Sequence, residues 1–134
     1  MPILPATALY VGLCGVMLVV LSIRVIALRR RYRIGIGDGG RDDLGRAVRV
    51  HANFVEYTPL ALLALAAVEL GGFPVWLVHA LGVALVAGRL LHAQGLTQSI
   101  GTSFGRFLGM LLTFGVLLIA SALCLAAAFG LPPG

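Results

Sequence analysis

Long apolar segments dominate this sequence and leave few folds open to it. Residues 6–28 and 107–129 each continue for more than twenty residues with at most one charged side chain. An α-helix needs about 20 apolar residues to cross the ~30 Å hydrocarbon layer of a bilayer. Hydrophobic residues make up 60% of the chain, well above the share in soluble proteins. The sequence therefore predicts a membrane protein whose first and last segments are spanning helices.

The middle of the chain contains two less obvious spans. Residues 75–96 are long enough to cross, although they contain an arginine and two histidines. The apolar run at 60–68 is too short alone, so its helix must extend back to about Arg46. Polar side chains then enter the membrane, where they must face protein or water. We expect an all-α membrane protein with one domain, 1–134, a four-helix bundle with spans near 6–28, 46–70, 75–96 and 106–129.

The distribution of charge predicts the orientation of the bundle. The ten basic residues are all arginines, and they concentrate around the loop at 29–45, whereas the turn ELGGFP has none. The positive-inside rule makes this loop cytoplasmic and places both termini on the non-cytoplasmic side. The same topology brings five arginines to one depth and so predicts a site for an anion: Arg24, Arg46, Arg49, Arg89 and Arg106.

Several other functions are disfavoured. The arginines flank or enter apolar segments and form no solvated basic face, so we expect no nucleic-acid partner. Cys14 and Cys124 lie inside apolar stretches without further ligands at metal spacing, so we expect buried thiols and no metal. The segment GIGDGG at 35–40 fits the glycine pattern of dinucleotide folds. It lacks the flanking strand that such a fold needs, and we interpret it as a cytoplasmic turn.

The most informative motif is RAVRVHANFVEYTP at 46–59. Arginines reaching the headgroups, with a glutamate neutralising one of them, would be purely structural. Glu56 is nearly three turns into the helix, however, and polar groups at such depth indicate function. His51 points to another face, so a ligand touching it and the other polar groups would need walls from another helix or a second subunit. At 100° per residue, the remaining polar side chains share one stripe: Arg46, Arg49, Asn53, Glu56 and Tyr57.

The last two spans place further polar groups at the same depth. Arg89 and His92 lie one turn apart on one face, and the arginine favours a ligand-binding role for His92 over simple packing. His79 lies near the other end without polar neighbours, and we expect it only to pack. Arg106 would reach either the interface or the anion. Glycines recur here at every fourth position, which allows membrane helices to pack closely: Gly101, Gly105 and Gly109.

The motif resembles the R-x-x-R-x-[HQ]-x-N-x-x-E-x-x-P signature of the membrane-associated proteins in eicosanoid and glutathione metabolism (MAPEG). The basic loop and GRLLHAQGL at 88–96 also have counterparts there. The resemblance, to a bacterial-type member, implies a homotrimer in the bacterial inner membrane that holds glutathione between subunits near the cytoplasmic face. It implies glutathione contacts from Arg46, Arg49, His51, Asn53, Glu56 and Tyr57, with Arg29 or Arg30, Arg89 and His92.

These residue types suit glutathione as co-substrate. Its two carboxylates can pair with arginines, and its ammonium or an amide with Glu56. A thiol pKa of about 8.5 must fall by roughly one to two units to yield mostly thiolate, at about 1.36 kcal/mol per unit. The resemblance assigns this catalytic role to Arg106, one or two residues from the family position. We expect a glutathione-dependent transferase or peroxidase that attacks lipophilic electrophiles or hydroperoxides arriving from membrane lipid.

Two alternatives stay open. The eicosanoid synthases of the family have a tyrosine one turn after His92, where this chain has Leu96. A hydroxyl would then have to come from Thr97, Ser99 or Ser103. This departure favours a non-catalytic lipid-binding or scaffold protein of the same fold, whereas the complete motif favours glutathione. A small four-span multidrug exporter is disfavoured, because its coupling glutamate lies on the first span and this first span has no acid.

Overall fold

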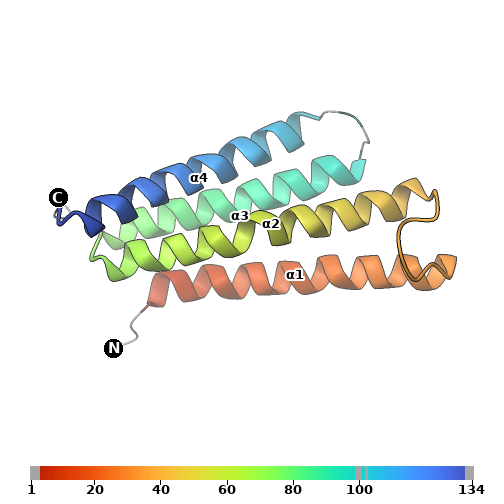
Figure 1. Cartoon of the computed structure of the whole chain (residues 1–134), viewed down its shortest axis with the longest axis horizontal. Coiled ribbons are helices and arrows are strands. Elements are labelled where there is room, and N and C mark those ends of the chain that lie inside the picture. The colour runs from red at the N-terminus through yellow and green to blue at the C-terminus, as the bar shows by residue number, and fades with distance from the viewer. Residues whose placement is uncertain (1–3, 99–100, 102, 132–134) are drawn as a thin grey trace.

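A computed structural model describes residues 4–98, 101 and 103–131 (Figure 1). These residues form four helices and no strand: α1 (Pro5–Tyr32), α2 (Asp42–Leu70), α3 (Val75–Gln98) and α4 (Phe104–Ala128). All four are long and apolar enough to cross a membrane. The predicted all-α class with four spanning helices is confirmed. The side of the membrane on which the termini lie stays a prediction.

The helices lie lengthwise beside one another, so that the connections gather at two ends (Figure 1). The start of α1, the end of α4 and the short α2–α3 turn lie together, and we call this the turn end. The α1–α2 loop, the end of α3 and the start of α4 lie together at the opposite end, which we call the loop end. The charge distribution predicts that the loop end is cytoplasmic.

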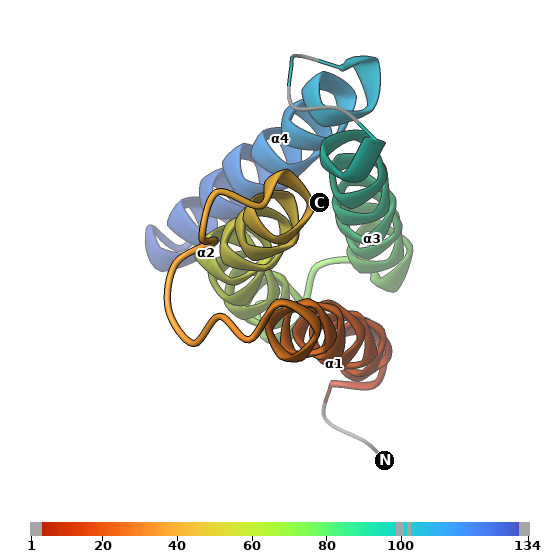
Figure 2. The same cartoon turned by 90° about the vertical axis from the view of Figure 1, so that its right-hand side faces the viewer.

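Helices α2 and α3 form the centre of the bundle, with α1 and α4 on opposite sides of them (Figure 2). Within the described residues, α1 and α4 do not contact each other. The core contains fully buried aliphatic side chains from the two central helices, including Leu65, Val78 and Leu85. Large apolar side chains on the outer faces of α1 and α4, such as Val16 and Leu118, are exposed and suit contact with lipid.

Glycines allow α3 and α4 to pack with their backbones close together. A Cβ atom at Gly109 would come within 2.5 Å of the Gly88 oxygen and 2.6 Å of the His92 nitrogen. A Cβ atom at Gly105 would come 3.0 Å from a backbone oxygen of α3. The close packing predicted from the glycine spacing is therefore confirmed for these two α4 positions. Gly101 precedes α4, and a Cβ atom there would meet no described neighbour.

The ionisable side chains of the turn end hold α1 in place. Glu69 accepts hydrogen bonds from the backbone N–H groups of Ala6, at 3.0 Å, and Thr7, at 2.7 Å. It thereby caps a helix that has no side-chain cap of its own. The Tyr10 hydroxyl lies 2.9 Å from His79 Nδ1 and donates to the His79 carbonyl oxygen at 3.1 Å. The expectation that His79 lacks polar neighbours was wrong, because packing of α1 against α3 supplies the partner.

Candidate functional site

A cavity of about 340 Å³ lies at the loop end, surrounded by the α1–α2 loop and by α2, α3 and α4. This volume is at the lower end of the range of small-molecule sites, roughly 300–1,000 Å³. We call it the polar cavity. Its lining includes five of the site residues predicted from the sequence: Arg46, Arg49, Asn53, His92 and Arg106. Side chains separated by up to sixty positions in the sequence thus meet at one place.

The α2 residues reach the cavity because they lie on successive turns of one helix. Helix α2 begins one turn before Arg46, and its first turn contains Asp42 and Asp43, whose charge suits a helix N-terminus. From there, Arg46, Arg49 and Asn53 all line the cavity. The stripe predicted from the helical period therefore faces a space large enough for a ligand.

Arg89 is buried, with 1% of its surface exposed. Its Nη2 donates to Asn53 Oδ1 at 2.5 Å, and its Nη1 donates to Thr113 Oγ1 at 3.4 Å. Its Nε has no partner among the described residues. Arg89 does not line the polar cavity, and it reaches the cavity through Asn53. Its bonds join three helices and fix the orientation of the Asn53 amide.

His92 and Leu96 line the polar cavity one turn apart on α3. His92 is 4% exposed, and its Nδ1 has no partner in the described part of the chain. Leu96 is buried. Leu96, which replaces the tyrosine of the eicosanoid synthases, therefore belongs to the cavity wall, and it is apolar there.

The hydroxyl groups expected to replace the tyrosine hydroxyl make different contacts. Thr97 Oγ1 accepts a hydrogen bond from Arg24 Nη1 at 2.9 Å and donates to the Ala93 carbonyl at 2.6 Å, so it joins α1 to α3. Ser103 Oγ caps α4 by accepting the backbone N–H of Arg106 at 3.3 Å. Ser99 lies outside the described residues.

A second cavity, of about 280 Å³, shares His92 and Arg106 with the first. Ser103, Phe107 and Met110 complete its lining, and we call it the apolar cavity. Arg106 belongs to the first turn of α4, and its Nη1 donates to the Gly101 carbonyl at 2.7 Å. The start of α4 also contributes the partial positive charge of a helix N-terminus. A ligand at this shared wall would thus meet positive charge on one side and apolar groups on the other.

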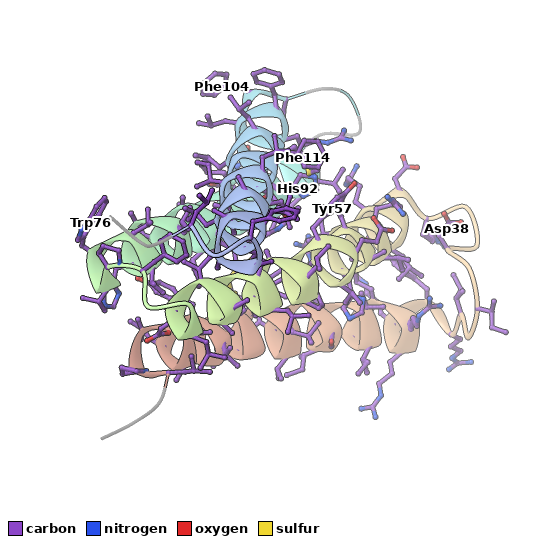
Figure 3. All side chains as sticks on the ribbon, turned by 60° about the vertical axis from the view of Figure 1, so that its left-hand side comes forward. Asp38, Tyr57, Trp76, His92, Phe104 and Phe114 are labelled. Carbon is purple, nitrogen blue, oxygen red and sulfur yellow. The ribbon has the colours of Figure 1, made fainter. Side chains whose placement is uncertain are left out.

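Glu56 and Tyr57 lie beside the polar cavity without lining it. Glu56 Oε1 forms an ion pair with Arg49 Nη1 at 3.5 Å, and the two side chains are 48% and 62% exposed. The Tyr57 ring packs edge-on against Phe114 of α4, with 5.5 Å between ring centroids (Figure 3). The half-exposed Glu56 side chain is therefore accessible from outside the chain.

The other predicted site residues make different contacts. His51 Nε2 lies 3.1 Å from Ser22 Oγ of α1, in agreement with the expectation that it points away from the stripe. Arg29 Nη1 donates to carbonyl oxygens of the α1–α2 loop, including that of Gly37 at 3.0 Å. Arg30 is exposed at the end of α1. Among the described residues, the lining of the polar cavity does not include His51, Arg29 or Arg30.

Sequence analysis missed two acidic residues of the polar cavity, Asp38 and Asp42. The α1–α2 loop turns back toward α2 through glycines with positive φ, including Gly37 and Gly40. Asp38 Oδ1 accepts the backbone N–H of Gly40 at 3.0 Å. A Cβ atom at position 45 would come 3.0 Å from Asp38 Oδ2, so Gly45 leaves room for that carboxylate. The sequence signal that could have pointed to Asp38 was an aspartate among glycines shortly before a helix.

Comparison with known proteins supports the family suggested by the motif. The protein is 43% identical to the inner membrane protein YecN of Escherichia coli strain K12 over 89 residues, which cover 66% of this chain and 68% of the relative. The protein of the same name from Escherichia coli O6:H1 matches to the same extent. With its four membrane-length helices, the chain is an integral membrane protein of the bacterial inner-membrane type. The sequence profile of the MAPEG family matches residues 7–126, and the chain belongs to this family.

Proposed function

We propose that this protein binds glutathione in the polar cavity and uses the thiolate to conjugate or reduce a lipophilic substrate. The observation that carries this proposal is the convergence of three arginine side chains, Arg46, Arg49 and Arg106, on one cavity. Guanidinium groups pair with carboxylates through two parallel hydrogen bonds, and glutathione carries two carboxylates. Asn53, held by Arg89, offers an amide for the peptide groups of the ligand.

Arg106 is the residue to which we assign activation of the thiol. It lines both cavities, so a sulfur atom beside it would face the apolar cavity. A guanidinium group and a helix N-terminus both stabilise a thiolate. Each unit by which the pKa of the glutathione thiol falls requires about 1.36 kcal/mol of such stabilisation. One close arginine is sufficient for a change of this size.

The substrate would be a lipophilic electrophile or hydroperoxide. Phe107 and Met110 supply an apolar wall next to the proposed sulfur position, and Phe107 is exposed on the lipid-facing side of α4. The thiolate would form a carbon–sulfur bond with an electrophilic carbon. With a hydroperoxide it would attack the terminal oxygen and release an alcohol, and a second glutathione would then convert the sulfenic acid to the disulfide and water.

The proposal includes a homotrimer, as the family resemblance implies. Arg49 lines the cavity and is 62% exposed, its partner Glu56 is 48% exposed, and His51 and Arg29 do not line the cavity. A neighbouring subunit placed against the exposed side chains of Arg49 and Glu56 would close the cavity. It would also bring its own polar groups toward the ligand.

A second candidate function is lipid binding without catalysis. The observation that favours it is Leu96, which lines the polar cavity where the eicosanoid synthases have a tyrosine. A cavity wall without that hydroxyl has one group fewer to orient or protonate a reacting substrate. In this case the arginines would hold the anionic head of a lipid.

The experiment that separates these functions is a titration of the detergent-solubilised protein with glutathione. Binding is followed by thermal stabilisation, and ionisation of the thiol by the ultraviolet absorbance of the thiolate. We expect saturable binding with a thiolate signal, and in Arg106→Ala we expect the signal to disappear while binding persists. Arg33→Gly is the matched control, because it removes another arginine of the loop end from a backbone with φ 54° that glycine accepts.

The remaining outcomes distinguish the two candidates. Glutathione binding without thiolate in the wild type would argue against catalysis by Arg106. Absence of glutathione binding would favour the lipid-binding function.

A further inference from the structure

The polar cavity contains charges of both signs on different walls. Its guanidinium groups come from α2 and α4, whereas its carboxylates, Asp38 and Asp42, come from the α1–α2 loop and the first turn of α2. Both aspartates are exposed at the solvent side of the cavity. A purely anionic ligand would complement the arginines and be repelled by the carboxylates. The distribution suits a ligand that carries carboxylates together with an ammonium group, as glutathione does at its γ-glutamyl end, where an ammonium and a carboxylate are bonded to one carbon.

Asp38 is held in place by the backbone of its own loop. Arg29 closes the loop by donating to the carbonyl oxygens of Gly35, at 3.1 Å, and Gly37, at 3.0 Å. The Arg41 N–H donates to the Asp38 carbonyl at 3.0 Å, which joins the loop to the start of α2. The Asp38 carboxylate is therefore presented to the cavity by an ordered turn, with Oδ1 bonded to the Gly40 N–H.

His92 gives an independent indication that this cavity accepts a polar partner. Its side chain is 4% exposed, and it lines the polar cavity together with Asp38. Its Nδ1 has no hydrogen-bond partner among the described residues. Buried side-chain nitrogen atoms nearly always have a partner, and an orphan beside a cavity indicates that a ligand or a water supplies it.

Glu56, the other carboxylate considered for the positive group of the ligand, does not line the cavity within this chain. The residue types suggested that Glu56 takes the ammonium or an amide of glutathione. In the structure, Glu56 is paired with Arg49 at 3.5 Å and does not line the polar cavity. Among the described residues, the carboxylates that line the polar cavity are those of Asp38 and Asp42.

We propose that Asp38, assisted by Asp42, forms a subsite for the primary ammonium group of the thiol co-substrate. The inference rests on the proposed binding of glutathione and adds to it the selection of a thiol peptide with a free amine. The γ-glutamyl end lies at the α1–α2 loop, where its ammonium faces Asp38 and its carboxylate faces an arginine of α2, and the glycine carboxylate lies against another arginine of the cavity. This arrangement fixes the direction in which the ligand enters the cavity and rejects thiols that carry only negative groups.

The test compares glutathione with N-acetylglutathione, in which the amine is blocked, by calorimetric titration of the full chain in detergent. We expect the wild type to bind glutathione about fivefold more tightly, since an ion pair with an exposed carboxylate contributes up to about 1 kcal/mol. In Asp38→Asn this preference should fall toward one, through loss of affinity for glutathione and hardly any change for N-acetylglutathione. Asp42→Asn should reduce the preference less.

Asp43→Asn is the matched control. It removes the same charge one residue away from Asp42, but the Asp43 carboxylate accepts the Tyr32 hydroxyl at 2.6 Å and does not line the polar cavity. The preference for glutathione should be unchanged in this variant. A preference that falls equally in Asp38→Asn and Asp43→Asn would show a general effect of charge and overturn the subsite.

Two other results would also overturn the inference. Equal affinity of the wild type for the two compounds would show that the ammonium is not recognised, while glutathione binding itself would stand. An equal loss of both affinities in Asp38→Asn would assign the aspartate to loop folding. If neither compound binds the wild type, the proposed function fails, and the ammonium subsite fails with it.

Discussion

The two ends of the bundle contain similar polar residues and use them differently. At the turn end, Glu69 bonds to two N–H groups of α1 and His79 bonds to Tyr10, while the buried Thr7 Oγ1 has no partner in the described chain and lines neither cavity. At the loop end, His92 and Arg89 each retain a buried nitrogen without a partner in the described chain, next to a cavity of about 340 Å³. Figure 3 shows that the two ends lie far apart along the bundle, with Trp76 near the turn end and Asp38 at the loop end.

This difference bears on how polar residues inside a membrane are interpreted. Polar groups there are costly and often functional, but a pair that satisfies itself only joins helices. A group left unsatisfied beside an open space is prepared for a ligand. Depth in the membrane therefore indicates function where the polar group also lines an open cavity, as Arg49 and Asn53 do although each has a partner within the chain. Four variants test this distinction.

Gly109→Ala should have the largest effect, because it separates the helices that form the loop end. The new Cβ atom would meet backbone atoms of Gly88 and His92 at 2.5 and 2.6 Å, which cannot move independently. We expect a loss of about 3 kcal/mol in stability, typical of overpacking, and loss of glutathione binding. Thermal unfolding in detergent and glutathione titration measure the two effects.

Gly115→Ala is the control on the same helix. A Cβ atom there would meet nothing within 4 Å among the described residues. Alanine favours the helix over glycine by about 1 kcal/mol, so this variant should be as stable as the wild type or slightly more stable. Equal destabilisation by both substitutions would contradict the close packing of α3 and α4.

Arg49→Ala should remove ligand binding without affecting the fold. The side chain is 62% exposed, so its loss leaves no buried group unsatisfied. Loss of a charge-assisted pair with a carboxylate of glutathione should cost about 2 kcal/mol, or roughly thirtyfold in affinity. Calorimetric titration measures the affinity, and thermal unfolding should give an unchanged midpoint. An unchanged affinity would place the ligand elsewhere.

Glu69→Ala should have the opposite effect at the turn end. The carboxylate caps α1 through the N–H groups of Ala6 and Thr7, and loss of such a cap costs about 1–2 kcal/mol. Glutathione affinity should not change, because the polar cavity lies at the other end. If Glu69→Ala weakened glutathione binding as much as Arg49→Ala does, the two ends would not be independent.

The features that the sequence predicted correctly are those that depend on local spacing. Apolar length defined four helices, and the helical period placed Arg46, Arg49 and Asn53 on one face. Glycines at every fourth position predicted the contact that Gly105 and Gly109 make with α3. Each of these depends on the geometry of a single helix, which the sequence specifies directly.

The features that the sequence did not predict depend on contacts between distant segments. Asp38 reaches the polar cavity only because the α1–α2 loop turns back through glycines with positive φ. Glu69 and His79 find their partners on α1, more than sixty residues earlier in the chain. Arg29 bonds to its own loop, although the family resemblance implied a glutathione contact from Arg29 or Arg30. Spacing within one helix contains no information about such partners.

Ser22→Ala has the smallest expected effect and tests the comparison at a single side chain. His51 lies at the depth of the loop end, but its Nε2 is 3.1 Å from Ser22 Oγ, so it is paired in the manner of the turn end. Loss of this bond should cost about 0.5–1.5 kcal/mol in stability, measured by thermal unfolding. Glutathione affinity should stay the same, because the hydrogen bond of His51 joins α1 to α2 and does not reach the polar cavity.

A tighter or weaker glutathione complex in Ser22→Ala would mean that freeing His51 changes the ligand site. A neighbouring subunit would then bring this face of α2 toward glutathione, as the family resemblance implies. Ser22→Thr, which keeps the hydroxyl, should then restore the wild-type affinity.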